Sequence, residues 1–132
     1  MESINLENNK TQMRRGILEM CVLSIISREE MYPSDIIAEL KKADLLVVEG
    51  TLYPLLTRLK SSGLLTYRWA ESKSGPPRKY YAITPAGEAF KDELLRTWRE
   101  LVAAVDSVQK LHIPILSPNP IDVITPNIKN LP

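Results

Sequence analysis

The sequence predicts a mainly α-helical protein with one small β-hairpin. Four segments carry apolar residues at helical spacing, and two short segments rich in aromatic residues flank a turn that contains Gly75-Pro76-Pro77. Capping residues and glycines separate these segments from one another. A chain of 132 residues is long enough for one domain of this kind.

The first two helices follow from apolar spacing and from one proline. Apolar residues predict a helix from Met13 to about Ser27, after a polar N-terminal arm over residues 1–12. Pro33 suits the first turn of a second helix, which we expect to end near Ala43. Residues 45–48 are short, apolar and partly β-branched, so they predict a connecting strand or an extended loop.

A third helix and a hairpin come next. Residues 49–51 are expected to turn the chain, and the helix that follows is expected to bury a row of leucines and to end at Gly63 in the left-handed conformation. Two strands, residues 65–70 and 78–84, follow it, and the turn-rich segment between them closes an antiparallel pair.

Thr84 and Pro85 predict the cap and the first residue of a long fourth helix that ends near Leu111. Its apolar residues step by three and four, as in a short heptad seam, so we expect it to pair with a second copy of the chain. The alternative is that these apolar residues of the fourth helix pack on the first helix of the same chain. The residues expected at the dimer interface are Leu94, Leu95, Trp98, Leu101, Val102, Val105 and Val108.

The order of the elements indicates a winged helix-turn-helix. In that fold the third helix enters the major groove of DNA and the hairpin, or wing, flanks it. The outward side chains of the third helix and the hairpin are cationic or carry hydroxyl groups, as needed to contact phosphates and base edges. For any single residue a solvated surface is the simpler interpretation, but the basic hairpin beside the helix favours DNA binding. The expected DNA-binding residues are Thr51, Tyr53, Thr57, Arg58, Lys60, Lys73, Arg78 and Lys79.

Composition restricts the other classes. The chain is 44% hydrophobic and 25% charged, has no apolar run long enough to cross a bilayer and starts without a secretory signal, so we expect a cytoplasmic protein. Its single histidine is His112, and its single cysteine, Cys21, lies within an apolar run. These residues predict neither a metal cluster nor a Cys–His pair, and we expect no cofactor and no enzymatic activity.

Two motifs together resemble the PadR family of transcriptional regulators. They are EGTLYPLL at residues 49–56 and GPPRKYY at residues 75–81, and the similarity extends over most of residues 13–110. The resemblance implies a protein that binds a palindromic operator, usually as a repressor, and that is released by a phenolic, drug-like or other effector. We expect a homodimer and a small aromatic effector. The single fourth helix is similar to that of short-form members. The entry to the second helix at residues 32–35, which usually contains glycine, departs from the family.

The resemblance also implies a place for the effector. In short-form relatives an aromatic residue at the position of Trp98 lines a pocket for planar compounds, although a tryptophan is more often part of a core. The expected walls of this pocket are Met13, Ile17, Trp98, Leu101 and Val102. A winged-helix module that contacts another protein and binds no DNA is the alternative function.

The expected organisation therefore has four parts. An arm over residues 1–12 precedes a DNA-binding domain over residues 13–84, a dimerisation helix over residues 85–111, and an irregular tail over residues 112–132. The tail holds half of the ten prolines of the chain and shows neither helical nor strand periodicity.

Overall fold

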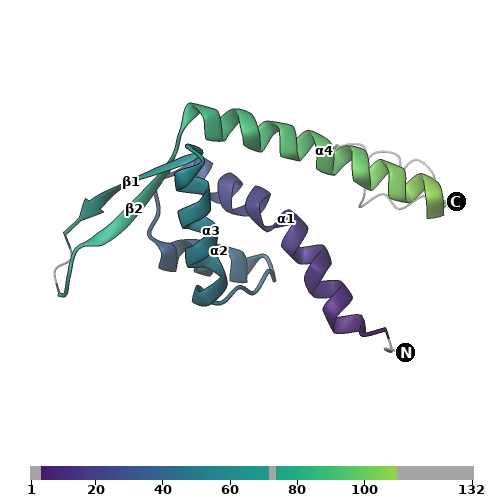
Figure 1. Cartoon of the computed structure of the whole chain (residues 1–132), viewed down its shortest axis with the longest axis horizontal. Coiled ribbons are helices and arrows are strands. Elements are labelled where there is room, and N and C mark those ends of the chain that lie inside the picture. Colours follow the sequence, from purple (N-terminus) through teal and green to yellow (C-terminus); the bar gives the residue numbers. More distant parts are fainter. Residues whose placement is uncertain (1–3, 72–73, 110–132) are drawn as a thin grey trace, which may run out of the picture. The chain divides into compact units, whose positions relative to one another are not determined.

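The computed structural model describes residues 4–71 and 74–109 (Figure 1). It contains helices α1 (Leu6–Arg28), α2 (Pro33–Lys42) and α3 (Glu49–Ser61), strands β1 (Leu65–Ala70) and β2 (Arg78–Ile83), and helix α4 (Pro85–Gln109). The expected fold class, mainly α-helical with one antiparallel hairpin, is confirmed. The chain divides into two compact units, residues 1–91 and 92–132. The expected tail lies outside the described residues.

Helix α1 begins earlier than the sequence predicts. Asn5 caps it, since the Asn5 side chain accepts a hydrogen bond from the backbone amide of Asn8 at 3.2 Å. Residues 6–12, expected as part of a polar arm, are therefore helical. The predicted start at Met13 is wrong because the helix begins at a capping side chain and not at the first residue of the apolar pattern. The first half of α1 is exposed, whereas its second half supplies buried residues to the core.

Helix α2 starts and ends as its local chemistry predicts. Helix α3 begins at Glu49, so the turn expected at residues 49–51 is wrong: these residues form the first turn of the helix, where the Glu49 carboxylate lies near the free amides. Pro33 is the first residue of α2, and the Asp35 carboxylate accepts a hydrogen bond from the Tyr32 amide at 3.1 Å. Residues 45–48 form an extended loop without a strand. Helix α3 ends at Ser61, and Gly63, just after the C-cap residue Ser62, has a φ angle of +80°, which a residue with a side chain rarely adopts.

The core of the first unit is made by the inner faces of α1, α2 and α3 and by the start of β1. Each fully buried side chain of this size contributes about 1.5–3 kcal/mol relative to an exposed one. The largest fully buried side chains are Leu23, Ile26, Ile36, Leu40, Leu52, Leu56, Leu65 and Val22. Because one face of α3 is buried in this core, the opposite face is exposed and available for other contacts.

The hairpin is held to the helices by main-chain bonds. Its register pairs Tyr67 with Tyr81, and Tyr81 also forms a bridge to Met31, which lies between α1 and α2. The two Met31–Tyr81 hydrogen bonds measure 3.0 and 2.9 Å. The hairpin is therefore fixed at its base, while its turn, which includes Gly75 at a φ of +128°, lies beyond the core.

The start of α4 approaches the backbone that ends α3. The Thr84 hydroxyl donates to the Gly63 carbonyl at 2.7 Å and accepts from the Gly87 amide at 3.0 Å, which confirms the predicted cap. A Cβ atom on Gly87 would lie 2.1 Å from the Leu64 carbonyl oxygen. Only glycine fits at this crossing.

In the second unit, α4 presents apolar side chains to solvent. Trp98, Leu101, Val105 and Val108 are 42, 54, 55 and 78% exposed. They follow the three-and-four spacing of the expected seam.

We expect Gly87→Ala to lower the free energy of unfolding by about 2 kcal/mol, because the new methyl group forces the Leu64 backbone away. Urea denaturation measures the change. Gly16→Ala is the matched control: its Cβ meets nothing within 4 Å, so it should leave stability unchanged or raise it by up to about 1 kcal/mol through helix propensity. Equal stabilities of the two variants would contradict the close crossing.

Candidate nucleic-acid interface

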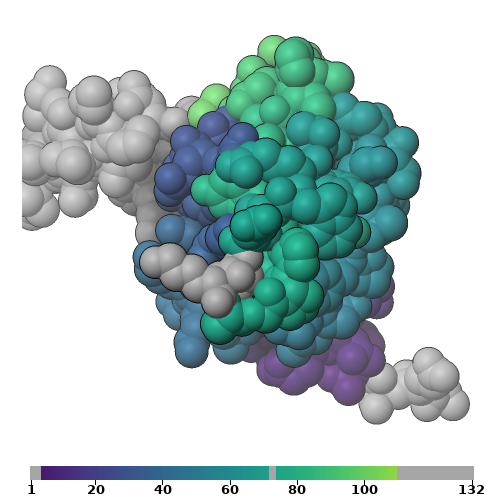
Figure 2. Space-filling view, turned by 90° about the vertical axis from the view of Figure 1, so that its left-hand side faces the viewer, coloured from purple at the N-terminus to yellow at the C-terminus, as the bar shows by residue number. Residues whose placement is uncertain are grey.

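A groove of about 300 Å³ lies between α3, the hairpin and the start of α2. It brings together four of the expected DNA-binding residues: Tyr53 and Thr57 from α3, and Arg78 and Lys79 from β2. Figure 2 views the first unit from the hairpin side, where the teal surfaces of α3 and the hairpin adjoin. Residues far apart in the sequence therefore form one continuous surface.

The periodicity of α3 determines which side chains reach this surface. Leu52, Leu55 and Leu56 are 0, 4 and 0% exposed, whereas Tyr53 and Thr57, four residues apart, are exposed on the other side of the helix. The sequence predicted this division correctly. It missed Trp69, a wing residue that is 60% exposed and lines the same groove.

Arg78 joins the wing to the start of α2. Its guanidinium lies 4.1 Å from the centre of the Tyr32 ring, and it donates a hydrogen bond to the Ser34 hydroxyl at 2.7 Å. The Tyr32 ring also contacts the Tyr80 ring, with centres 4.7 Å apart. Arg78 thus holds β2 against α2 while its charge stays at the edge of the groove.

Lys79 lies over an aromatic pair on the hairpin. Its ammonium is 4.6 Å from the centre of the Tyr67 ring and 5.5 Å from that of Trp69. The ammonium of Lys60, at the end of α3, is 5.7 Å from the Tyr67 ring on which Lys79 also lies. Lys60 and Lys79, which both lie near the Tyr67 ring, therefore bring positive charge to the junction of α3 and the wing.

The cations of this surface are not neutralised by acidic neighbours. Among the described residues, no carboxylate lies within 4.0 Å of Lys60, Arg78 or Lys79, in contrast to Arg68, which pairs with Glu30 at 3.2 Å. Burial, and then the neighbouring phenols of Tyr67 and Tyr53, raises the pKa of Tyr81, so its hydroxyl stays protonated. Unpaired cations beside neutral hydroxyl groups fit a polyanionic partner.

Other expected DNA-binding residues lie elsewhere. The Arg58 guanidinium turns toward α1 and donates to the Glu19 carboxylate, with Nε at 3.2 Å. Thr51 lines a different pocket at the opposite end of α3. Lys73 lies outside the described residues, and the roles of all three stay predictions.

The expected effector walls come from both units of the chain. Met13 is 75% exposed and Ile17 is half-buried in the first unit, while Trp98, Leu101 and Val102 belong to the second. The proposed pocket among them therefore stays a prediction.

Comparison with known proteins gives the family. The model of the transcriptional regulator PadR-like family matches residues 22–93. The chain belongs to the PadR family. It is 55% identical to a PadR-like transcription factor from Bacteroides fragilis, covering 76% of this chain and 98% of that one with a TM-score of 0.66. It is 34% identical to a PadR family transcriptional regulator from Eggerthella lenta. That match covers 81% of this chain and 94% of the other, with a TM-score of 0.75.

A transcriptional regulator of Mycobacterium tuberculosis is 32% identical over 96 residues, which cover 71% of this chain and 87% of the relative. Membership of the PadR family makes this protein a transcriptional regulator with a winged helix-turn-helix, and supports the expectation that it is not an enzyme.

No described helix is long and apolar enough to cross a membrane, and the described residues contain no group of three metal-ligating side chains. Burial raises the pKa of the Cys21 thiol, which therefore stays protonated and weakly nucleophilic near neutral pH.

We expect Arg78→Ala to lower the free energy of unfolding by about 1 kcal/mol, because it removes both the contact with the Tyr32 ring and the hydrogen bond to Ser34. Lys60→Ala, which removes an exposed cation with one distant ring contact, should change stability by less than about 0.5 kcal/mol. Chemical denaturation measures the free energy of unfolding of both variants. Equal decreases in the two variants would show that Arg78 does not anchor the wing.

Proposed function

We propose that the protein represses transcription by binding a palindromic DNA operator as a homodimer. The observation that carries this proposal is the groove in which hydroxyl-bearing residues of α3, Tyr53 and Thr57, lie beside the cations Arg78 and Lys79 of the wing. In this arrangement the cations contact phosphates and set the position of the protein, while the α3 side chains reach base edges and read the sequence. Lys60, whose ammonium lies 5.7 Å from the centre of the Tyr67 ring, adds a cation beside this groove. Thr51, Arg58 and Lys73 stay proposed DNA contacts.

The exposed seam of α4 supports the dimer. An apolar row of this length on a helix is unusual at a solvent-facing surface and is typical of an interface. A twofold pairing through Trp98, Leu101, Val105 and Val108 gives each protomer an equivalent recognition helix, which an inverted-repeat operator requires.

A small aromatic effector is the proposed signal. Trp98 is 42% exposed and offers a flat apolar ring on the same seam, and Met13, Ile17, Leu101 and Val102 complete the proposed walls. Such a ligand controls DNA binding only if it favours one arrangement of the two DNA-binding heads over another.

Selection from a pool of random duplexes tests operator binding. We expect an inverted repeat to be enriched, and binding to it to weaken steeply as salt rises, because the cations displace condensed counterions. Lys79→Ala should weaken all duplexes similarly, whereas Thr57→Val should change the preferred sequence. A pool without any enriched sequence would favour the alternative, a winged-helix module that contacts another protein.

Replacing Leu101 and Val105 together by Asp should convert the dimer to a monomer, since unpaired carboxylates would be buried at the twofold seam. Light scattering measures the mass. The charge-matched control is the pair Ala103→Asp and Ser107→Asp, on α4 positions outside the three-and-four spacing. If the control also dissociates, or the first variant stays dimeric, the seam is assigned wrongly.

A further inference from the structure

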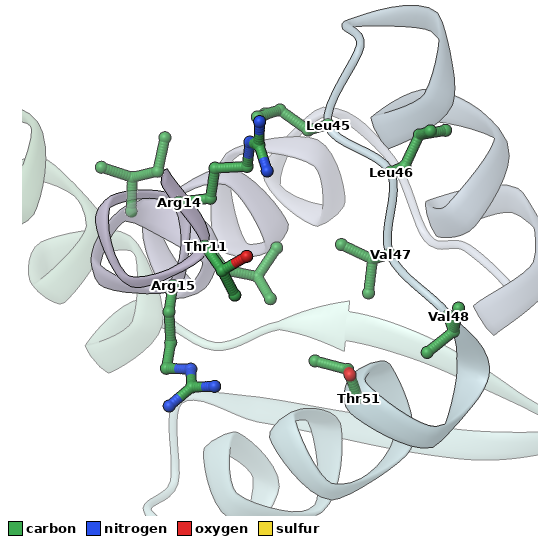
Figure 3. A pocket seen from close by; sticks show the side chains of 10 residues that line it. Thr11, Arg14, Arg15, Leu45, Leu46, Val47, Val48 and Thr51 are labelled. Carbon is green, nitrogen blue, oxygen red and sulfur yellow. The ribbon is translucent and has the colours of Figure 1, made fainter. Parts of the chain in front are cut away.

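A second pocket lies at the other end of α3, away from the wing. It measures about 240 Å³ and is formed by α1, the extended loop before α3 and the first turn of α3. Figure 3 shows the arrangement: Arg14 and Arg15 leave α1 on opposite sides of the pocket, Thr11 lies between them, and Val47 and Thr51 face α1 from the other wall. None of the described lining residues comes from the wing or from α4.

The polar part of the pocket is positively charged. Arg14 and Arg15 are exposed, and among the described residues no carboxylate lies within 4.0 Å of either guanidinium. The nearby acidic residues of α1 have other partners, since Glu7 pairs with Lys10 and Glu19 pairs with Arg58. The described residues that line the pocket include no acidic side chain, and their other polar side chains are Thr11 and Thr51. The charge is complementary to an anion.

The remaining walls are apolar. The half-buried side chains of Leu18, Leu45 and Val47 line the pocket, and Leu46 and Val48 beside them are 75 and 71% exposed. Leaving such side chains in water costs hydrophobic free energy that an apolar ligand would recover. The pocket thus combines two cations at its rims with an apolar floor.

We propose that this pocket binds a small organic anion with an apolar body. The anionic group meets Arg14 or Arg15 and the Thr11 hydroxyl, and the apolar body lies against Leu18 and Val47. Of the residues proposed as aromatic effector walls, Ile17 alone is among the described lining residues of this pocket.

The pocket is also placed to act on DNA binding, and this part of the inference rests on the proposed function. Thr51 lies in the first turn of α3, and its backbone amide donates to the Val48 carbonyl at 3.0 Å, so the loop and the helix start move together. A ligand held between α1 and this loop changes the angle at which α3 is presented, and therefore its fit to the major groove.

Octanoate is the probe, titrated into the full-length protein without DNA and followed by amide chemical shifts. We expect shifts centred on Thr11, Val47 and Thr51, no comparable binding of octan-1-ol or octylamine, and at least a tenfold loss of affinity in the double variant Arg14→Gln and Arg15→Gln. Lys10→Gln is the matched control, because it removes one cation from the same exposed half of α1 but lies outside the pocket. Its affinity for octanoate should equal that of the wild type.

Three outcomes would overturn the site: no binding of octanoate, equal binding of octan-1-ol, or equal losses in the Lys10 and arginine variants. Melting temperatures of all variants show that each is folded. Regulation is tested separately, by measuring affinity for the selected duplex with and without octanoate. An unchanged affinity overturns the regulatory step, whereas a protein that binds octanoate but no duplex refutes the proposed function and leaves the pocket in place.

Discussion

The burial of one face of α3 is the constraint on which the arrangement of the first unit depends. Leu52, Leu56 and Leu59 are 0, 0 and 2% exposed, and α3 packs against α2 and β1. Rotation of α3 about its axis would expose these leucines, at about 1.5–3 kcal/mol for each. The orientation of Tyr53 and Thr57 is therefore a consequence of the core, and so is the presence of a polar helix face beside the hairpin.

The hairpin reaches that helix face because it is tied down at its base and along one edge. Tyr81 lies opposite Tyr67 in the strand register, while its backbone amide and carbonyl both bond Met31, so the outer edge of β2 is tied to the segment between α1 and α2. Arg78 adds a side-chain contact with Tyr32 and Ser34, at the start of α2. One residue thereby combines a structural contact with a position in the groove, and a substitution there changes both wing geometry and surface charge.

Local signals in the sequence predicted the elements well. The leucine period of α3, the Pro33 start of α2 and the Thr84 cap of α4 each depend on residues within one or two turns, so their chemistry is visible in a short window. Long-range contacts were not visible. The Arg58–Glu19 pair joins residues 39 positions apart, and an exposed arginine on a recognition helix gives no local sign that it faces another helix.

The two ends of α3 carry different surfaces, and α1 connects them. Arg58 ties α3 to Glu19 of α1, and a few residues earlier α1 supplies Arg14 to the second pocket. Toward its end, α1 places Ser27 where its hydroxyl donates to Glu88 of α4 at 2.6 Å, a bond that lowers the pKa of that carboxyl. Because close-packed helices shift as units and do not deform gradually, a displacement of α1 at the pocket also reaches α3 and the start of α4. Helix α1 therefore has contacts in three places: it lines the second pocket, it pairs with α3 through Glu19 and Arg58, and it bonds the start of α4 through Ser27 and Glu88.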